Sequence, residues 1–384
     1  MIVTFVCDVL GEANNGTTIA TLNVAHYLKS QGHEVRIVCP DKDKEGTPGY
    51  FVVPSINFGP FNGYVRHNGV TLASSKDKDT VIKALEGADV VHFNFCGALS
   101  SWCVKYCNEH NIPCTASFHA QAENFTNHVY LDKAGFANKV MYKILNRNLF
   151  SKVKAIHYPS EFIHHFFQNE TKNKVPAYVI SNGIHADFEK LDVKRPPELE
   201  GKIVILYSAR YSAEKSHKVL IKAMKYSKHN KDVVLVLAGA GPKEKKIKKL
   251  CKKYCANPAV LGFHSHEQMI ELLSMTDIYA HCGRVDIEPL GCLEALSIGL
   301  CPVLTDSKVS AVSGYALDPN NVFHHKSSKD CAAKIDYWID HPQERIENGQ
   351  KYLIYRQKYN FDESMRKMEQ MFKEVASGQP KEMI

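Results

Sequence analysis

Three carboxylates lie close together in residues 285–303, VDIEPLGCLEALSIGLCPV. Asp286, Glu288 and Glu294 fall within nine positions, just before a run of small and apolar residues. Such a run is typical of a buried segment, and carboxylates at its start can accept hydrogen bonds from hydroxyl groups. They therefore belong either to a ligand site or to a solvated loop.

Two cations lie in a second charged segment, SARYSAEKS at 208–216. Arg210 ends a predicted strand, and Lys215 follows in the loop before the next predicted helix. Arginine makes forked contacts with phosphate oxygens, and lysine supplies a point charge. Either residue alone would be an ordinary surface residue, but together the two can bind one polyanion.

A predicted helix start near Gly291 could provide a third contact for an anion. The free backbone amides and the dipole at the start of a helix favour negative charge. Glu294 lies one turn inside this helix, where its carboxylate could accept hydrogen bonds from ribose hydroxyls. A phosphate-bearing ligand would explain all of these features.

The elements that must position these residues follow one pattern along the chain. Short apolar runs alternate with helical patterns, which indicates parallel strands covered on both faces. The runs are IVTFVCDV, EVRIVCP, DVVHFNF, PCTASFH, KAIHYPS and AYVISNG, then KIVILYSAR, DVVLVLAGAG, NPAVLGF, DIYAHCG and CPVLTDS. We predict an α/β fold with two doubly wound, Rossmann-like domains, in which ligands bind at the carboxyl ends of the strands.

A polar segment that holds Pro196 and Pro197 predicts a linker near residues 186–201. The length of 384 residues also favours two domains, because it exceeds what one hydrophobic core usually serves. The predicted domains are 1–186 and 187–359, with a C-terminal helix at about 360–384 that can pack back on the first.

The composition is that of a globular protein, with 44% hydrophobic and 23% charged residues. No stretch approaches the roughly 18 apolar residues that span a bilayer, and the chain starts with a strand-like run instead of a signal sequence. We therefore expect a cytoplasmic protein. The 12 cysteines fit this expectation, because they are scattered and form no CxxC pair.

Two motifs suggest other chemistry but are incomplete. GAGP at 239–242 follows a predicted strand, yet it lacks the third glycine and the acidic residue of a dinucleotide site. A glycine turn that clears a neighbouring backbone explains it. The DKD motifs at 41–43 and 77–79 lie in polar loops, which favours solvated turns over a metal site. We expect no metal cofactor and no nucleic-acid partner.

Residues 131–154 form a predicted amphipathic helix in which Lys139, Lys143 and Arg147 recur every four residues. An apolar stripe adjoins these cations and consists of Phe136, Val140, Met141, Ile144, Leu145 and Leu149. The helix can pack this stripe on its own sheet, or residues 133–154 can also rest on an anionic membrane surface. Both interpretations stay open. A second basic run at 242–255 is typical of a solvated helix face.

An ordered set of motifs resembles a known family. The second half holds SARYSAEKS, GAGP, VLGFH, and the pair Asp286 and Glu294 before ALSIGLCPV; the first half holds NNGTT, SQGHEVRIV, DVVHFNF, SFHAQAEN, HYPSEF and VISNGI. The set resembles the retaining, nucleotide-sugar-dependent glycosyltransferases of family 4, whose GT-B fold has two Rossmann-like domains facing each other across a cleft. The segment from Asp286 to Ser307 looks most like the branch containing bacterial diacylglycerol glucosyltransferases.

The resemblance implies a donor site in the second domain. Arg210 and Lys215 would hold the diphosphate, and Glu294 would bind the ribose. Asp286 replaces the family's usual glutamate near the sugar hydroxyls, and because aspartate has a shorter reach, Glu288 can share or assume that role. The remaining donor contacts would be the helix start Gly291, Cys292 and Leu293, and the base-binding loop Gly262, Phe263 and His264.

In the first domain, the resemblance implies that Gly16 lets a loop approach the phosphates and that His119 lies beside the donor sugar. A satisfied buried histidine is the alternative for His119. His92 and Asn94, at another strand end, are weaker candidates. Glu123 and Asn124 are plausible acceptor contacts.

The implied reaction transfers a hexose from a UDP-sugar, UDP-glucose by preference, without a metal and with retention through front-face attack. A membrane lipid such as diacylglycerol is the expected acceptor, and the enzyme would then dock on the inner face of the cell membrane. A soluble or polysaccharide acceptor stays open. A sugar-binding protein without catalysis and a nucleotide-sugar epimerase are two further functions that the same fold could serve.

Overall fold

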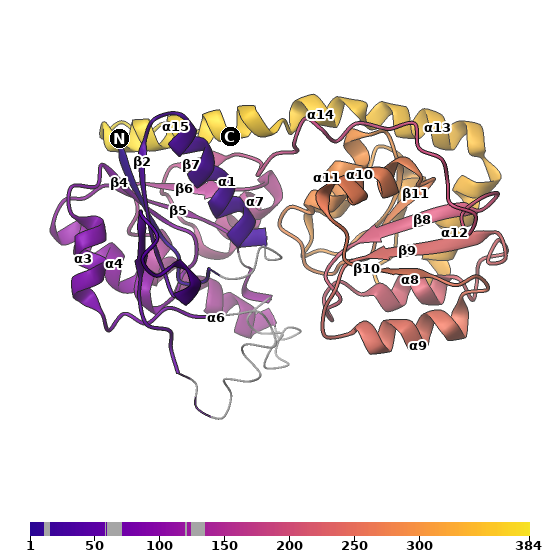
Figure 1. Cartoon of the computed structure of the whole chain (residues 1–384), viewed down its shortest axis with the longest axis horizontal. Helices are drawn as coiled ribbons and strands as arrows, with labels where there is room; N and C mark the ends of the chain where they lie inside the picture. The colour runs from indigo at the N-terminus through magenta and orange to yellow at the C-terminus, as the bar shows by residue number, and fades with distance from the viewer. Residues whose placement is uncertain (11–15, 58, 60–70, 120, 124–134) are drawn as a thin grey trace. The chain divides into compact units, whose positions relative to one another are not determined.

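The computed structural model describes residues 1–10, 16–57, 59, 71–119, 121–123 and 135–384 (Figure 1). The chain divides into two compact units. Unit 1 comprises Met1–Asn182 and Ser364–Ile384, and unit 2 comprises Gly183–Glu363.

Unit 1 contains a seven-stranded parallel sheet with the order β3-β2-β1-β4-β5-β6-β7. The strands are β1 (Ile2–Val6), β2 (Glu34–Cys39), β3 (Tyr50–Val52), β4 (Val90–Phe93), β5 (Cys114–Ser117), β6 (Ala155–Tyr158) and β7 (Ala177–Val179). Every residue of β4, β5 and β6 is buried, as expected for strands that are covered on both faces.

The described helices of unit 1 are α1 (Gly16–Ser30), η1 (Lys42–Lys44), α3 (Lys78–Leu85), α4 (Ala98–Glu109), α6 (Gly135–Leu145), the π-helical turn η3 (Asn146–Phe150), α7 (Glu161–Thr171) and most of α15 (Phe361–Ala376). The last of these comes from the end of the chain. In α15, the Phe372 ring lies 6.1 Å from the Phe5 ring of β1 and 5.2 Å from the His92 ring of β4. This helix therefore completes the core of unit 1.

Unit 2 contains a six-stranded parallel sheet with the order β10-β9-β8-β11-β12-β13. The strands are β8 (Ile203–Ser208), β9 (Val233–Ala238), β10 (Val260–Gly262), β11 (Ile278–His281), β12 (Cys301–Thr305) and β13 (Val322–Phe323). The order reverses between β8 and β11, and such switch points are where doubly wound sheets bind ligands.

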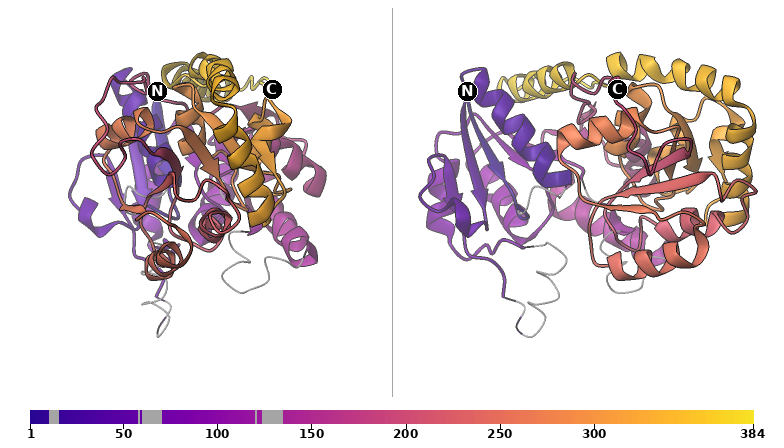
Figure 2. Two further views of the ribbon diagram at one scale, coloured as in Figure 1. Left: turned by 90° about the vertical axis from the view of Figure 1, so that its right-hand side faces the viewer. Right: turned by 45° about the vertical axis from the view of Figure 1, so that its right-hand side comes forward.

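The described helices of unit 2 are α8 (His217–Ala223), α9 (Glu244–Tyr254), α10 (His266–Ser274), α11 (Leu290–Ser297), η4 (Ala311–Tyr315), η5 (Pro319–Asn321), α12 (Ser328–Asp340), α13 (Pro342–Lys351), η6 (Tyr352–Ile354) and α14 (Tyr355–Lys358). Figure 1 shows α8 and α9 on one side of the sheet and α10 and α11 on the other, and Figure 2 shows these layers from two further directions. None of the described helices combines the length and the hydropathy needed to cross a membrane.

The predicted fold class is confirmed, because both sheets are parallel and have the strand order of Rossmann-like domains. Each predicted apolar run contains a strand. The pattern missed β3 and β13, which have three and two residues. The two units meet in the sequence at 182/183 and 363/364, a few residues from the predicted domain boundaries.

The apolar stripe predicted for the helix at 131–154 does not form one buried face. Within the described part of this helix, from Gly135 onward, Tyr142 and Leu145 face the core, and so does the polar Asn138. Phe136 is 81% exposed, and Val140 and Ile144 are also exposed. Asn138 and Tyr142 are turned inward because both donate hydrogen bonds to the buried Glu123, at 3.2 and 2.6 Å.

Candidate active site

A half-buried ion pair lies at the switch point of unit 2. Asp286, in the loop between β11 and α11, accepts a hydrogen bond from Lys215 Nζ at 2.6 Å and contacts His281 Nε2 at 2.9 Å. The side chains of Lys215, Asp286 and His281 are 21%, 11% and 3% exposed. Burial by itself raises the pKa of Asp286, but Lys215 and His281 overcome this effect and hold the pKa at about 2. Asp286 is therefore ionised at neutral pH.

Gly283 makes room for this cluster. A Cβ atom at Gly283 would lie 2.7 Å from Asp286 Oδ2 and 2.8 Å from His281 Nε2, where a side chain would push the two partners apart. The backbone N–H of Arg284 donates to the Glu214 carbonyl at 2.7 Å, which ties the loop after β11 to the loop that carries Lys215.

Arg210 is the second residue of the loop after β8, and its side chain is exposed. The next residue, Tyr211, is buried and donates its N–H to the Ala240 carbonyl at 2.8 Å. A Cβ atom at Gly239 would lie 2.2 Å from the Ala209 carbonyl oxygen, and one at Gly241 would lie 2.9 Å from that of Tyr211. The prediction that GAGP clears a neighbouring backbone is thus confirmed, and that backbone carries Arg210.

The predicted base-binding loop adjoins the same turn. Gly262 accepts a hydrogen bond from Gly239 N–H at 2.6 Å and donates its own N–H to the Tyr211 hydroxyl at 3.2 Å. Phe263 is 72% exposed. His264 is half-buried, and burial lowers its pKa.

Helix α11 begins at Leu290, with Pro289 at the N-cap and no side-chain hydrogen bond to the cap. A Cβ atom at Gly291 would lie 2.3 Å from the Ser208 hydroxyl of β8, so glycine lets this helix start approach the end of β8. Cys292 and Leu293 are buried. Burial raises the pKa of Glu294 to about 7, while Glu288 is half-buried in the preceding loop.

In unit 1, His119 follows β5 and lines a small cavity. Burial and then the neighbouring His157 lower the pKa of His119 to about 3, so its ring is neutral at physiological pH. The other lining residues are Asn94, Phe95, Cys96, Ser117, Leu145 and Phe150.

The weaker candidates of unit 1 are held by internal hydrogen bonds. His92 contacts Thr115 Oγ1 and Ser117 Oγ, each at 2.7 Å, and Ser117 Oγ in turn contacts His157 Nδ1 at 2.7 Å. Asn94 donates to Thr21 Oγ1 at 2.7 Å. These contacts favour a structural role for His92 and Asn94.

Gly16 is the first residue of α1, and no atom lies within 4 Å of a Cβ built on it. Its predicted approach to phosphates stays a prediction. Asn124 lies outside the described residues, as do residues 11–15, which precede Gly16 in the sequence, and residues 133 and 134 of the basic segment.

The DKD motifs act as helix caps. Asp41 accepts a hydrogen bond from Asp43 N–H at 3.2 Å, and Asp77 accepts one from Thr80 N–H at 3.2 Å. Within the described part of the chain, no group of three or more His, Cys, Asp or Glu side chains is arranged to hold a metal ion.

Unit 2 thus brings two of the predicted site residues, Lys215 and Asp286, into direct contact. Gly291, at the start of α11, lies next to Ser208 at the end of β8. Sequence reasoning missed His281 and Tyr211. Each has an aromatic ring in an apolar segment and resembles a core residue, and the position of His281 at a strand end was the available signal.

Comparisons with known proteins bear on the family and the fold of the chain. The description "Glycosyltransferase Family 4" matches residues 14–188, and "Glycosyl transferases group 1" matches residues 189–352. No curated protein matches the chain.

Among solved structures, the catalytic domain of cholesterol-alpha-glucosyltransferase from Helicobacter pylori is 39% identical, with 41% of this chain and 99% of that chain covered and a TM-score of 0.40. HepE of Anabaena in complex with UDP-glucose is 14% identical, and the match covers 98% of this chain and 100% of that chain with a TM-score of 0.73. Sucrose-phosphate synthase of Thermosynechococcus elongatus is 15% identical, and the match covers 99% of this chain and 100% of that chain with a TM-score of 0.74. The latter two show the likeness in fold.

Proposed function

Because this chain belongs to the group 1 glycosyltransferases of family 4, it retains the anomeric configuration of a nucleotide-sugar donor, and we propose that it transfers glucose from UDP-glucose to a hydroxyl of a membrane lipid. Diacylglycerol and other lipid alcohols are acceptors of the proposed class. The observation that carries the donor part is the half-buried contact between Lys215 and Asp286 at the switch point of unit 2.

The contact supports a role for Lys215 in holding the diphosphate. An ionised Asp286 fixes the Lys215 ammonium group in one position, so little side-chain entropy is left to lose when phosphate binds. The pair with Asp286 uses one of the three donors of the ammonium group and leaves two for phosphate oxygens. Arg210, in the same loop after β8, would supply the second cation for the negative charge that develops on the leaving group.

Asp286 has room for a second role. A carboxylate has about four lone-pair positions, and Lys215 and His281 occupy two of them. A sugar hydroxyl can therefore still donate to Asp286. We assign Asp286 both the positioning of Lys215 and a contact with the donor sugar, with Glu288 as the next carboxylate along the loop.

Glu294 and Phe263 suit the nucleoside. The carboxylate of Glu294 lies in the first turns of α11, where ribose hydroxyls would donate to it while the phosphates meet the helix start. Phe263 exposes an aromatic ring beside a backbone that is held by Tyr211, and a base can stack on such a ring. Uracil is the proposed base.

His119 suits a neutral contact with the donor sugar. Because its pKa lies near 3, its ring has one N–H donor and one acceptor nitrogen at physiological pH. Such a ring can bind a sugar hydroxyl but carries no charge. The departing phosphate would then take the proton of the acceptor hydroxyl, without a covalent intermediate on a carboxylate.

The acceptor proposal rests on the exposed side of α6 and η3, which we call the lipid face. It consists of an apolar row, Phe136, Val140 and Ile144, beside a cationic row, Lys139, Lys143 and Arg147. Both rows follow the four-residue spacing of one helix surface. Apolar side chains can enter the headgroup region of a bilayer while the cations meet anionic lipids, and each cation contributes about 1 kcal/mol near such a surface.

The transfer reaction is tested with labelled UDP-glucose, the full-length protein and membrane lipids. We expect a labelled lipid with an α-linked glucose and the release of UDP. The Lys215→Met variant should lose this product, while Lys222→Met, which removes an exposed lysine of α8, should retain it. A labelled soluble oligosaccharide in place of lipid would refute the lipid acceptor, and no transfer to any acceptor would refute the donor site.

The lipid face is tested by flotation with phosphatidylcholine vesicles that do or do not contain phosphatidylglycerol. We expect binding to the anionic vesicles that weakens as salt rises, and loss of this binding in Phe136→Ser/Ile144→Ser. The variant Lys245→Gln/Lys249→Gln, on the exposed surface of α9, controls for general charge. Equal flotation of the serine variant and the wild type would contradict the proposal.

A further inference from the structure

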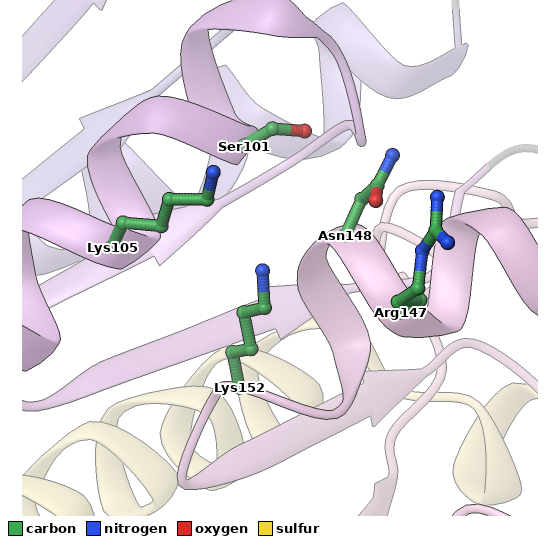
Figure 3. Close-up of a pocket in the computed structure, with 5 residues that line it drawn as sticks. All are labelled: Ser101, Lys105, Arg147, Asn148 and Lys152. Carbon is green, nitrogen blue, oxygen red and sulfur yellow. The ribbon is translucent and has the colours of Figure 1, made fainter.

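A basic pocket lies between α4 and η3 in unit 1, with a volume of about 420 Å³. Figure 3 shows Ser101 and Lys105 on α4, Arg147 and Asn148 on η3, and Lys152 in the loop that follows. The ammonium groups of Lys105 and Lys152 end in the space between these elements (Figure 3). These five residues define the pocket.

The charge of this pocket is unbalanced. Three of its lining residues are cations, and no carboxylate is among the five. None of the ion pairs recorded between described residues involves Lys105, Arg147 or Lys152. Cations that share a hollow repel one another, so an anion bound among them is favoured.

The walls of the pocket are held in place by the backbone. The turn η3 is π-helical, and π-helical turns occur frequently at functional sites. It closes with the i to i+5 hydrogen bond from Ser151 N–H to the Asn146 carbonyl, at 2.9 Å. Asn108 of α4 donates to the Lys152 carbonyl at 3.1 Å. The two walls are therefore linked before any ligand arrives.

We propose that the basic pocket binds a phosphomonoester, either free in solution or as the headgroup of a lipid. Arginine gives forked contacts with phosphate oxygens, and two lysines offset a doubly charged anion. The Ser101 hydroxyl and the Asn148 amide add neutral hydrogen-bond donors. The volume lies in the range of small-molecule sites, so the group that carries the phosphate fits as well.

This site is separate from the transfer reaction. Its residues belong to unit 1 and are not among those assigned to the donor, and phosphate binding does not require that glucose be transferred. Arg147 also belongs to the lipid face, so the test leaves it unchanged and alters Lys105 and Lys152 instead.

The first experiment is a calorimetric titration of the full-length protein with glycerol 3-phosphate at low salt. We expect binding that weakens as sodium chloride rises. Each of Lys105→Gln and Lys152→Gln should lower the affinity about tenfold, because each loses a charge-assisted contact. Lys245→Gln/Lys249→Gln, with the same loss of charge as the double variant, should bind like the wild type. A circular dichroism spectrum and a cooperative melting transition like those of the wild type show that each variant has folded.

The second experiment identifies the source of the phosphate, with vesicles of phosphatidylcholine that contain phosphatidic acid or lack it. If a lipid headgroup is the ligand, Lys105→Gln/Lys152→Gln loses its preference for phosphatidic acid. If a soluble ester is the ligand, only glycerol 3-phosphate binding falls. Both results support the pocket. Affinities for both probes that match the wild type in Lys105→Gln/Lys152→Gln would overturn it, even if the lipid face and the transfer reaction proved correct.

Discussion

The substitution Asp286→Asn tests the central contact of unit 2 most directly. The pKa of Asp286 falls from its ordinary value of 3.8 to about 2. At 1.36 kcal/mol for each pKa unit, this corresponds to roughly 2–3 kcal/mol of net stabilisation of the ionised carboxylate in the folded state. We therefore expect the variant to lower the free energy of unfolding of unit 2 by roughly 2–3 kcal/mol at pH 7.

The pH dependence of this loss follows from the direction of the shift. Because the pKa is lower in the folded state, the stabilisation is fully present above pH 3.8 and is lost only as the pH falls toward 2. The difference between the variant and the wild type should therefore stay constant from pH 5 to pH 8. A difference that changed within this range would contradict the assignment of the stabilisation to the ionised Asp286.

The assay is urea unfolding followed by the fluorescence of Trp338, which is 2% exposed in α12. The chain has two tryptophans, so a Trp102→Phe background makes the signal specific to unit 2. Asp232→Asn, at an exposed aspartate, should change stability by less than about 0.5 kcal/mol.

A double-mutant cycle with Lys215→Met isolates the pair. The two substitutions should not be additive, because each removes the same contact. Additive losses, or an Asp286→Asn variant as stable as the wild type at pH 7, would refute the reasoning.

Three further outcomes are expected. Arg210→Ala should lower kcat by about 10²–10³, or roughly 2.7–4 kcal/mol, with an unchanged melting temperature; near-normal turnover would remove Arg210 from the mechanism. UDP affinity should rise about tenfold between pH 6 and pH 8, because Glu294, with a pKa of about 7, ionises over this range and its carboxylate then accepts hydrogen bonds from the ribose hydroxyls. In Glu294→Gln, calorimetry should find only the rise in affinity that the ionisation of the UDP phosphates causes. Gly283→Ala should weaken the contact between His281 and Asp286 and so reduce both stability and activity. A fully active variant would show that the loop after β11 can shift to accept the methyl group without loss of activity.

The fold could be predicted from the sequence because strands covered on both faces leave continuous apolar runs. All residues of β9 and β12 are buried, and their runs are unmistakable. The edge strands β3 and β13 were missed because two or three residues give no measurable period. The face of α6 was also misjudged, since hydrogen bonds to Glu123 turn the polar Asn138 inward.

The site was predictable in its residue types but not in its contacts. Lys215 and Asp286 are 71 positions apart, and no local pattern reports that they touch. The same holds for Asp8, whose carboxylate accepts the N–H groups of Leu99 and Ser100 at 2.9 Å and so caps α4. Long-range polar contacts of this kind depend on strand order, which a single sequence does not encode locally.

The position of α15 has a consequence for biosynthesis. Phe372 packs beside Phe5 and His92. Phe5 and His92 precede Phe372 in the sequence by some 280 to 370 positions, so they are synthesised long before it. Part of the interior of the nascent first unit therefore stays uncovered until residues 361–376, which form α15, have been translated. A chaperone that covers this exposed surface of unit 1 would act during the synthesis of unit 2.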